Sequence, residues 1–401
     1  NLKVICQMIS EAYVFVEGLE TEPVVCGVVH YDAVNQLGRF RYGKSYLARH
    51  DAFALDPIHL PLTENSYETR VNKGLFGVLT DAGADAWGRK LILQLRKAKP
   101  KNELEFIVAG ASMGVGALSF SLSRSKSKSP TNRNSLDNLN LLVEGKNKIL
   151  ASETVSVEVK KAFQYGDSIG GARPKTVLIH DNQMHLVKFN RSDDLINICR
   201  AEFAAMQLLA QIDDVNVAET ELINGVEDLL LVRRFDRSGT DVSHHLISAN
   251  SLLLEGHASE AALTKWYSYG ALAEYLRRYS RRAKDAEELY KRMVFNALIG
   301  NTDDHGRNHA LIWHLKGGGL QLSPAYDVLP VNNTRLHAIG LGDEGRFASR
   351  KNLLSQAKRF GLSAQKAQGI VNDIHDLVDD WEVHFSRAGV SDGDIERLKG
   401  I

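Results

Sequence analysis

The sequence is poor in cysteine and has no long hydrophobic run. Its 401 residues include three cysteines, Cys6, Cys26 and Cys199, scattered along the chain and never in Cys-x-x-Cys spacing. That pattern argues against a disulfide framework and against a zinc site, and it favours a reducing compartment. No stretch reaches the ~18 apolar residues of a membrane helix, and the N-terminal residues show no signal-peptide pattern. We therefore expect a cytoplasmic protein with no membrane partner.

The sequence also lacks net charge. Lys plus Arg and Asp plus Glu both number 49, so no overall field attracts nucleic acid or an anionic membrane. Any contact with DNA would need a local patch or a partner protein. The composition, 44% hydrophobic and 24% charged residues, is that of a globular protein. Because one hydrophobic core seldom serves more than ~250–300 residues, the length predicts two or three domains.

The most informative stretch is a polar loop between two apolar runs. Between Asp303 and His309 the chain carries two carboxylates, two imidazoles, a guanidinium and a carboxamide. Such groups can accept protons, hold cations and neutralise phosphate. Asn, Asp and Gly are also the usual turn formers, so the loop alone leaves a purely structural interpretation open.

The N-terminal region has a β pattern. Segments 12–18, 24–31 and 38–42 are rich in β-branched and aromatic residues between turn formers, which predicts an antiparallel meander. The acidic turn before Trp87 is interpreted as the capped start of a helix. The Ser- and Lys-rich stretch 121–134 has little to bury and is expected to be a mobile surface loop.

A Gly-rich segment, 167–176, follows two short helices predicted between Leu136 and Phe163. It leads into a hairpin, 177–189, that turns at Asp181-Asn182. A Gly-rich turn lets backbone N–H groups approach an anion, and Arg173 and Lys175 add positive charge. By itself this signal is weak, because any β-turn can carry two glycines.

The remaining chain becomes mainly helical. Apolar spacing predicts an amphipathic helix over Leu195 to Ile212, with Glu202 beside its buried stripe, and then strands at 220–223 and 228–237. Further helices are expected at 261–279, 284–300, 352–360 and 363–385, with a hairpin at 310–314 and 320–322.

The order of these elements is the plan of a protein kinase. A Gly-rich hairpin is followed by a strand lysine, Lys188, a helix glutamate, Glu202, the pair Asp303 and Asn308, and finally Asp327. Asp303 and Asn308 have the spacing of the kinase catalytic loop D-x-x-x-x-N. Asp303 could accept the proton of a substrate hydroxyl, and carboxylate and carboxamide oxygens suit Mg²⁺.

These residues resemble the HipA-like serine/threonine kinases, which are toxins of bacterial type II toxin–antitoxin modules. The resemblance spans nearly the whole chain and rests on motifs at Ser168–Lys175, His185–Lys188, Val232–Arg237, Asn301–Asn308 and Tyr326–Leu329, with Asp81–Arg89 and Gly114–Leu118 in the N-terminal part. It implies an α+β, protein-kinase-like bilobal fold with a β-rich N-terminal subdomain and a mainly helical C-terminal lobe. We expect the subdomain at 1–120, a mobile Ser/Lys-rich loop at 121–135, an N-lobe-like region at 136–240 and the helical lobe at 241–401.

The resemblance also implies roles for individual residues. Asp303 would be the catalytic base, Asn308 and Asp327 would ligate Mg²⁺, and Ser168 would be a site of autophosphorylation. Arg233 stands where an acidic residue is expected, and Arg307 replaces a common lysine. The residues expected to bind ATP are Ser168, Ile169, Gly170, Gly171, Ala172, Lys175, Lys188, Glu202, Arg233, Arg234, Phe235, His305 and Arg307.

The family's substrates and partners are implied in the same way. Its targets are aminoacyl-tRNA synthetases, phosphorylated to stall translation, and its antitoxin HipB is a helix-turn-helix dimer that would provide the only route to DNA. Two alternatives stay open. The chain could be a catalytically weak co-repressor scaffold acting with a DNA-binding antitoxin. It could also be a metal-dependent hydrolase with Asp303, Asp304, His305 and His309 as ligands, although this leaves Lys188 unexplained.

Overall fold

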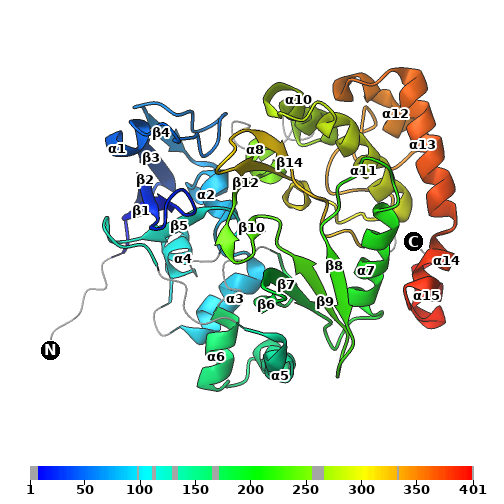
Figure 1. Cartoon of the computed structure of the whole chain (residues 1–401), viewed down its shortest axis with the longest axis horizontal. Helices are drawn as coiled ribbons and strands as arrows, with labels where there is room; N and C mark the ends of the chain where they lie inside the picture. The colour runs from blue at the N-terminus through cyan, green and yellow to red at the C-terminus, as the bar shows by residue number, and fades with distance from the viewer. Residues whose placement is uncertain are drawn as a thin grey trace. The chain divides into compact units, whose positions relative to one another are not determined.

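The computed structural model describes residues 8–96, 99–110, 114–128, 134–164, 171–254, 266–331 and 334–399. The chain divides into two compact units (Figure 1). Unit 1 comprises Asn1–Met184 and Asp236–Ile247, and unit 2 comprises His185–Phe235 and Ser248–Ile401. The finer division expected from the sequence, with boundaries after residues 120, 135 and 240, stays a prediction.

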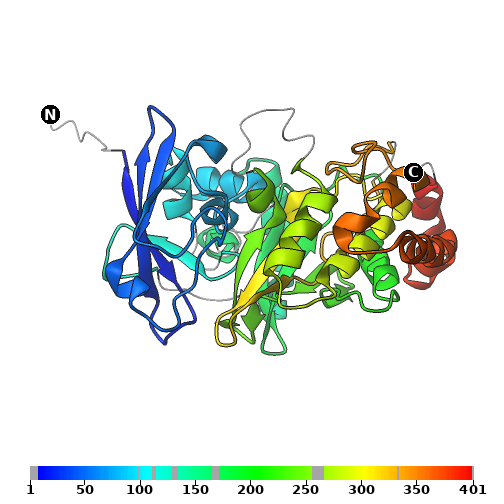
Figure 2. The same ribbon diagram turned by 90° about the horizontal axis from the view of Figure 1, so that it is seen from above.

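Unit 1 is organised around a five-stranded antiparallel sheet. Its strand order is β4-β3-β2-β1-β5, and Figure 2 shows it nearly edge-on. The predicted meander is therefore confirmed. Buried side chains alternate along β3, as expected for strands with one face on a core. The strands are β1 (Glu11–Val16), β2 (Val24–Asp32), β3 (Leu37–Tyr42), β4 (Ser66–Thr69) and β5 (Leu118–Ser121).

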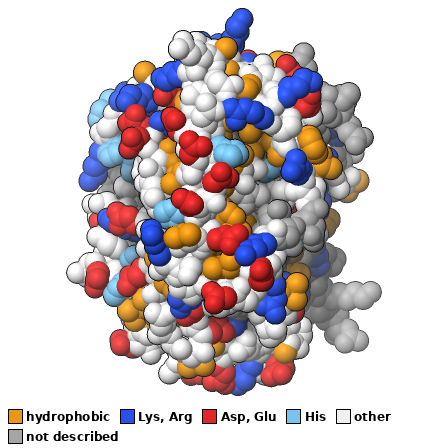
Figure 3. All heavy atoms as spheres, turned by 90° about the vertical axis from the view of Figure 1, so that its right-hand side faces the viewer, with side chains coloured by type: hydrophobic (Ala, Val, Ile, Leu, Met, Phe, Trp, Pro, Cys, Tyr) orange, Lys and Arg blue, Asp and Glu red, His pale blue; other side chains and the backbone are white. Residues whose placement is uncertain are grey.

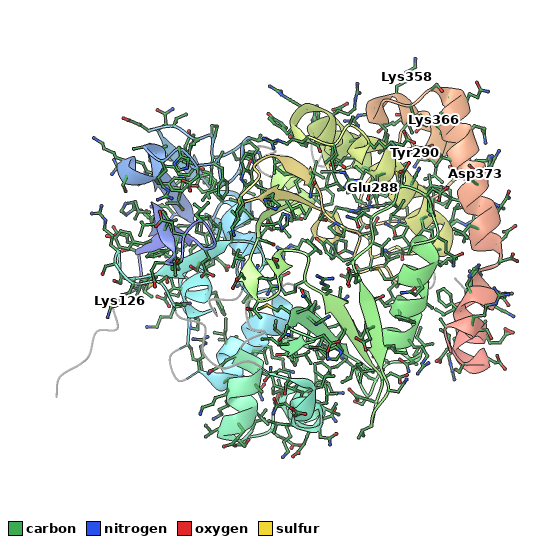
Figure 4. All side chains as sticks on the ribbon, viewed as in Figure 1. Lys126, Glu288, Tyr290, Lys358, Lys366 and Asp373 are labelled. Carbon is green, nitrogen blue, oxygen red and sulfur yellow. The ribbon has the colours of Figure 1, made fainter. Side chains whose placement is uncertain are left out.

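Helices and short strands complete unit 1. α4 packs against β1 and β5. Beyond β5, the predicted Ser- and Lys-rich loop is described as far as residue 128, and Lys126 projects outward (Figure 4). The elements are α1 (Lys44–Leu47), η1 (Val71–Lys73), α2 (Gly77–Asp81), α3 (Ala86–Leu95), α4 (Glu103–Ala109), η2 (Leu136–Asn138), α5 (Leu139–Leu150), α6 (Val157–Gln164), β6 (Lys175–His180), β10 (Arg237–Ser238) and β11 (Asp241–Val242), with β12 (His244–Ser248) ending at the unit boundary.

A buried ion pair explains why a late segment belongs to unit 1. Asp236 and Arg237 are 3% and 7% exposed, and their side chains pair at 2.8 Å. Asp236 also accepts from Gly116 N at 2.7 Å, while Arg237 donates to Gly114 O at 2.9 Å. These bonds hold 236–237 against a loop about 120 residues earlier, as the separations of 120 and 123 residues show.

The predicted hairpin turn at Asp181-Asn182 is present. Both residues have positive φ, 48° and 57°. Asp and Asn tolerate this left-handed region better than other non-glycine residues. The strand that follows, β7 (Gln183–Phe189), carries the chain from unit 1 into unit 2.

Unit 2 contains a small antiparallel sheet and most of the helices. β7 pairs with β9, and β9 pairs with β8. α7 packs on β8 and β9, and α11 packs against α10 and α13. The elements are α7 (Ile198–Leu209), β8 (Thr220–Ile223), β9 (Leu229–Arg233), α8 (Ala249–Leu254), α10 (Tyr269–Tyr279), α11 (Asp285–Ile299), η3 (Gly306–Asn308), β13 (Ala310–His314), β14 (Leu320–Leu322), α12 (Arg350–Ser355), η4 (Ala357–Phe360), α13 (Ala364–Asp379), α14 (Trp381–Arg387) and α15 (Asp392–Leu398).

Several helix boundaries predicted from periodicity were wrong. α7 begins only at Ile198, because the Asn197 side chain caps it by accepting from Arg200 N, and Leu195 is 83% exposed. α10 begins at Tyr269 after the Ser268 cap, and residues 261–265 lie outside the described part. The helices expected at 352–360 and 363–385 are each broken into two elements.

α11 is the central helix of unit 2. Its acidic first turn favours the positive end of the helix dipole, and Gly300 ends it with a φ of 75°. Glu288 and Tyr290, labelled in Figure 4, form hydrogen bonds with different segments of the unit. Glu288 accepts from Asn216 N at 2.9 Å, whereas Tyr290 donates to Leu353 O at 3.0 Å. The helix thus ties together elements from both ends of the unit.

The surface has mixed charge. On the face shown in Figure 3, basic and acidic side chains are interspersed, as the balanced composition predicts. Within the described residues, no helix has the length and apolar character needed to cross a bilayer.

Candidate functional site

The centre of the site is Lys188 on β7. Lys188 lies opposite Leu230 of β9, so a paired strand on one side fixes its backbone. Its ammonium group donates to Glu202 Oε1 at 2.5 Å, and the Glu202 side chain, on α7, is only 4% exposed. The Asn197 cap sets where α7 starts and therefore which side chain faces Lys188. A strand lysine whose side chain is 12% exposed thus has a buried helix carboxylate as its fixed partner.

A second carboxylate, Asp327, reaches the same lysine. Asp327 Oδ1 accepts from Lys188 Nζ across a separation of 139 residues. Burial would by itself lower the pKa of Lys188, but the carboxylates of Asp327 and Glu202 outweigh it and raise that pKa above its usual value. Lys188 is therefore a permanent cation at neutral pH. Unlike Glu202, the Asp327 side chain is 45% exposed and open to a ligand.

Asp327 also has an unusual backbone. Its φ is 61°, in the left-handed region that few non-glycine residues adopt. Conformations of this kind cost of order 1–3 kcal/mol and often occur at functional sites. The neighbouring segment is held firmly, because Ala218 N donates to Ala325 O at 2.9 Å and Ala325 N donates to Asn216 O at 2.8 Å.

The loop after α11 separates two adjacent aspartates. Asp303 is exposed, whereas Asp304 is completely buried. The turn begins where Asn301 N donates to Asn296 O at 2.9 Å, just past the Gly300 cap. Asp303 therefore remains available to an incoming molecule, and Asp304 does not.

Asp304 is held by two side chains. Tyr269 of α10 donates to its Oδ2, and His309 Nε2 lies 2.8 Å from its Oδ1. Asn296 of α11 donates in turn to the Tyr269 hydroxyl at 2.9 Å. Burial, and then the charge of Asp304, raise the pKa of Tyr269 well above its usual value, so the phenol stays protonated and can donate. Because Asp304 and His309 flank residues 305–308, their contact closes the loop.

This closure bears on the hydrolase alternative. Both Asp304 oxygens are bound to protein groups, so Asp304 and His309 do not offer the ligand set that such an enzyme would need. Among the residues that the structure describes, no group of three or more His, Cys, Asp or Glu side chains is arranged to hold a metal ion.

Asn308 comes close to Asp327. Its Nδ2 donates to the Asp327 carbonyl at 3.5 Å, and Asn308 itself is 6% exposed. The pair offers one carboxamide oxygen and one carboxylate, which are hard ligands of the kind Mg²⁺ prefers alongside phosphate oxygens and water. The residues present therefore fit a magnesium ion that a phosphorylated ligand completes.

Aromatic residues link the site to the connecting strand, which is β9 with the two residues that follow it, Leu229 to Phe235. The Phe235 and Tyr326 rings have centroids 5.5 Å apart, and the Tyr326 hydroxyl donates to Arg307 O at 2.8 Å. Arg233 is engaged by Glu219 at 2.7 Å, and Arg234 is buried at 8% exposure. The side chain of Arg233 is thus directed to a neighbouring carboxylate, and its backbone N–H donates to Glu219 O at 2.9 Å.

The Gly-rich segment belongs to unit 1, and part of it is described. Ser168, Ile169 and Gly170 lie outside the described residues. Gly171 has a φ of 102°, a backbone conformation that residues with a side chain rarely adopt, which favours glycine there. Ala172 is exposed and Lys175 is buried.

The acidic turn before Trp87 has a different role from the one expected. Asp85 occupies the N-cap position of α3, but its side chain does not cap that helix. Its Oδ2 instead accepts from Gly171 N at 2.9 Å, and Trp87 Nε1 donates to Lys175 O at 2.8 Å. Both ends of the turn 171–175 are therefore fastened to α3, because a carboxylate can bind any accessible N–H and the tertiary contact prevails over the local one.

Sequence reasoning did not single out Tyr269, Asn296, Asp85 or Tyr326 as site residues. Tyr269 and Asn296 carried no signal, since a buried tyrosine in an amphipathic helix is ordinary. Asp85 and Tyr326 lie within two of the motifs noted in the sequence. His305 is half-buried, and its Nδ1 has no hydrogen-bond partner among the described residues.

Two family models match this sequence. Residues 167–381 match the HipA-like C-terminal domain, and residues 21–121 match the HipA N-terminal domain. The structure is similar to a chain of the solved complex of HipA, HipB and operator DNA from Shewanella oneidensis MR-1. That match has a TM-score of 0.69 at 16% identity and covers 96% of this chain and 94% of the other. The expected α+β, kinase-like fold is thus confirmed.

Similar curated proteins carry kinase names. A kinase-named protein of Haemophilus influenzae is 24% identical over 220 residues, covering 49% of this chain and 63% of that protein. The kinase-named Y4mE of Sinorhizobium fredii is 33% identical over 137 residues, covering 32% and 31%. The serine/threonine-protein kinase toxin HipA of Shewanella oneidensis is 24% identical over 195 residues, covering 41% and 43%. The matched stretches span less than two thirds of each of these relatives.

Proposed function

The chain belongs to the HipA-like family, and from this premise and the site geometry we propose that it is an ATP-dependent serine/threonine protein kinase. The observation that carries the proposal is the position of Lys188, between the buried Glu202 and the half-exposed Asp327. A cation with one buried and one exposed carboxylate partner can bind phosphate while keeping its orientation. Phosphoryl transfer depends on such positioning and on offsetting charge.

The residues divide the work of the reaction. Lys188 holds the nucleotide phosphates, and Glu202 keeps its ammonium group in place. Asn308 and Asp327 would hold Mg²⁺, which offsets negative charge on the phosphates when it is bound. Asp303, exposed on the same loop as Asn308, accepts the proton of the attacking serine or threonine hydroxyl. The Asp304–His309 contact fixes the loop that carries both residues.

The Gly-rich segment and the connecting strand would complete the nucleotide site. Gly171, Ala172 and Lys175, with Ser168 to Gly170, would face the phosphates, and the backbone at Arg233 to Phe235 would meet the adenine. His305 and Arg307 would add polar contacts from the loop. Ser168 would be an autophosphorylation site, since a phosphate there adds up to about two negative charges beside groups that hold ATP.

We propose the substrate and the partner of this kinase from its membership of the HipA-like family. The substrate would be a cytoplasmic protein, with an aminoacyl-tRNA synthetase as the leading candidate, and its phosphorylation would inhibit translation and growth. A HipB-like helix-turn-helix antitoxin would neutralise the kinase and connect it indirectly to DNA. The solved relative in complex with HipB and operator DNA supports this partner.

Labelled ATP tests the proposal directly. The purified protein is incubated with γ-labelled ATP, Mg²⁺ and a cell lysate, beside the Asp303→Ala variant. We expect label on the protein or on a lysate component with the wild type only. If neither protein transfers label to itself or to a lysate component, the kinase assignment is wrong. A phosphoproteome comparison after expressing the two forms in cells would then name the substrate.

A further inference from the structure

A short ladder follows the Asp327 segment. Between Arg335 and Ala348 the chain folds back on itself: Ala348 N donates to Arg335 O at 2.8 Å, and His337 N donates to Arg346 O at 2.9 Å. Leu336 and Phe347 lie opposite each other as an antiparallel bridge. Residues directly opposite in such a ladder put their side chains on the same face. Leu336 and Phe347 therefore stand side by side.

This pair faces solvent next to a buried residue. Leu336 is 54% and Phe347 is 42% exposed, whereas His337, next in sequence, is 1% exposed. A single exposed apolar residue is ordinary, but two adjacent ones on an ordered surface form a small apolar patch that a partner could cover.

The surroundings of the pair are cationic. Arg335 and Arg346 are both exposed, and neither forms an ion pair with any residue that the structure describes. Of the two acidic residues of the same hairpin, Glu344 pairs with Lys351 at 2.5 Å, whereas Asp343 accepts from the neutral Gln356 amide at 2.9 Å and keeps its charge. Two arginines against one uncompensated carboxylate leave a net positive charge. The charge left for a partner is positive, and guanidinium groups suit carboxylates.

The ladder is held rigidly. Asn352 is completely buried, and its Nδ2 donates to Gly345 O at 3.0 Å and to Phe347 O at 2.7 Å. A surface fixed in this way loses little conformational entropy when it binds.

The ladder is also tied to the loop that carries Asp303. Ala338 N donates to Thr302 O at 3.0 Å, and Thr302 is the residue before Asp303. Two residues of extended chain, ~7 Å, separate Ala338 from Leu336. A polypeptide lying on the ladder could therefore present a hydroxyl group to Asp303.

Building on the proposed kinase function, we infer that Arg335, Leu336, Arg346 and Phe347 form a docking surface for the polypeptide substrate. The segment that docks carries acidic residues next to apolar ones, near the serine or threonine that is phosphorylated. The carboxylates meet the two arginines, and the apolar side chains cover Leu336 and Phe347.

Two synthetic peptides test this inference. Each has one serine and several leucines, and they differ only in glutamate or lysine at the remaining charged positions. We expect the glutamate peptide to have a kcat/KM at least roughly tenfold higher, because each exposed ion pair contributes a few-fold. In the double variant Arg335→Glu with Arg346→Glu the preference should disappear or reverse, and higher salt should weaken it in the wild type. Leu336→Ser should lower use of both peptides.

Matched variants serve as controls. Lys316→Glu with Arg387→Glu makes the same change in net charge at two exposed positions of unit 2, and Val383→Ser removes an apolar side chain that is 47% exposed. Peptide binding is also measured by fluorescence anisotropy with Asp303→Asn, in which turnover should be too slow to interfere. Hydrolysis of ATP without peptide should be the same in all the surface variants.

The outcomes separate the two proposals. Equal use of both peptides by an active wild type, or an equal loss of preference in the control variants, would overturn the docking surface alone. The docking surface would also be overturned if the wild type were a dimer that dissociates in the Leu336→Ser variant, because the surface would then be the interface with a second copy of the chain. No phosphoryl transfer to any acceptor would instead remove the kinase function, and the docking inference with it.

Discussion

Each unit contains a buried ion pair, and the two pairs differ in what they leave for a ligand. In unit 1, Asp236 and Arg237 bind each other and the backbone of Gly114 and Gly116. In unit 2, Lys188 binds the buried Glu202 and the half-exposed Asp327. The first arrangement uses its charges to fasten one loop. The second keeps one carboxylate accessible, which is what a binding site for phosphate and a cation requires.

The comparison shows how a buried ion pair that is structural can be distinguished from one that is functional. Burial alone does not distinguish a structural pair from a functional one, since both cost desolvation energy and both are strongly destabilised if one partner is removed. The exposure of the remaining partner distinguishes them. Variants of the exposed site residues of unit 2, such as Asp303, should therefore change activity at constant stability more readily than variants of the buried pair of unit 1.

The largest expected effect concerns the two adjacent aspartates of unit 2. Asp303→Asn should lower kcat by roughly 10²–10⁴-fold, as expected for loss of a general base. Its free energy of unfolding should stay within about 0.5 kcal/mol of the wild type, because the side chain is exposed. Phosphate transfer and urea unfolding measure the two quantities. The matched Asp304→Asn variant should be destabilised, because its carboxylate holds Tyr269 and His309. Equal destabilisation of both would contradict the assigned roles.

The unit 1 pair should show the reverse behaviour. Asp236→Asn leaves the Arg237 charge buried without its partner, so we expect a loss of roughly 3–5 kcal/mol in unfolding free energy. Activity per folded molecule should be unchanged. Arg39→Ala, which breaks the exposed pair with Glu68, should cost less than about 1 kcal/mol. If Asp236→Asn lowered kcat and left the unfolding free energy unchanged, the purely structural role assigned to the unit 1 pair would be wrong.

A buried histidine should make unit 1 sensitive to acid. His245 is 1% exposed and bonds to Leu55 O at 2.8 Å, and burial lowers its pKa from 6.5 to about 4. The unfolded chain binds a proton below pH 6.5 and the folded one does not until about pH 4. The contribution is therefore fully present above pH 6.5 and is lost progressively as pH falls toward 4.

That loss should amount to about 3 kcal/mol, from the difference in pKa. Unfolding free energies measured across this range should fall less steeply in His245→Gln than in the wild type. His50→Gln, at an exposed position, is the control. Parallel curves for His245→Gln and the wild type would refute this origin of the acid sensitivity.

The smallest effect is expected at the connecting strand. Arg233→Ala removes a pair in which the Arg233 and Glu219 side chains are 37% and 73% exposed, so stability should change by less than about 1 kcal/mol. If only the backbone of this strand meets the adenine, KM for ATP should change less than about threefold. A tenfold rise in KM, measured in the same transfer assay, would show that the side chain itself binds nucleotide.

Much of the fold could be predicted because its signals are local. The meander of unit 1, the Asp181-Asn182 turn and the stretch of α11 follow from residue alternation, turn chemistry and apolar spacing, which act over a few residues. Helix ends were predicted less well, as at Leu195 and Tyr269, because a cap side chain decides them. The assignment of 236–247 to unit 1 depends on bonds to a loop about 120 residues away.

The candidate site shows the same division. The sequence by itself determined which chemical groups are present and in what order, from Lys188 to Asp327, because residue types and spacing carry that information. Only the tertiary structure decided that Asp303 is exposed and Asp304 buried, that Lys188 meets a carboxylate 139 residues away, and that Asp85 binds Gly171 instead of capping its helix. These contacts depend on how separate elements pack, and packing selects among partners that are chemically equivalent in the sequence.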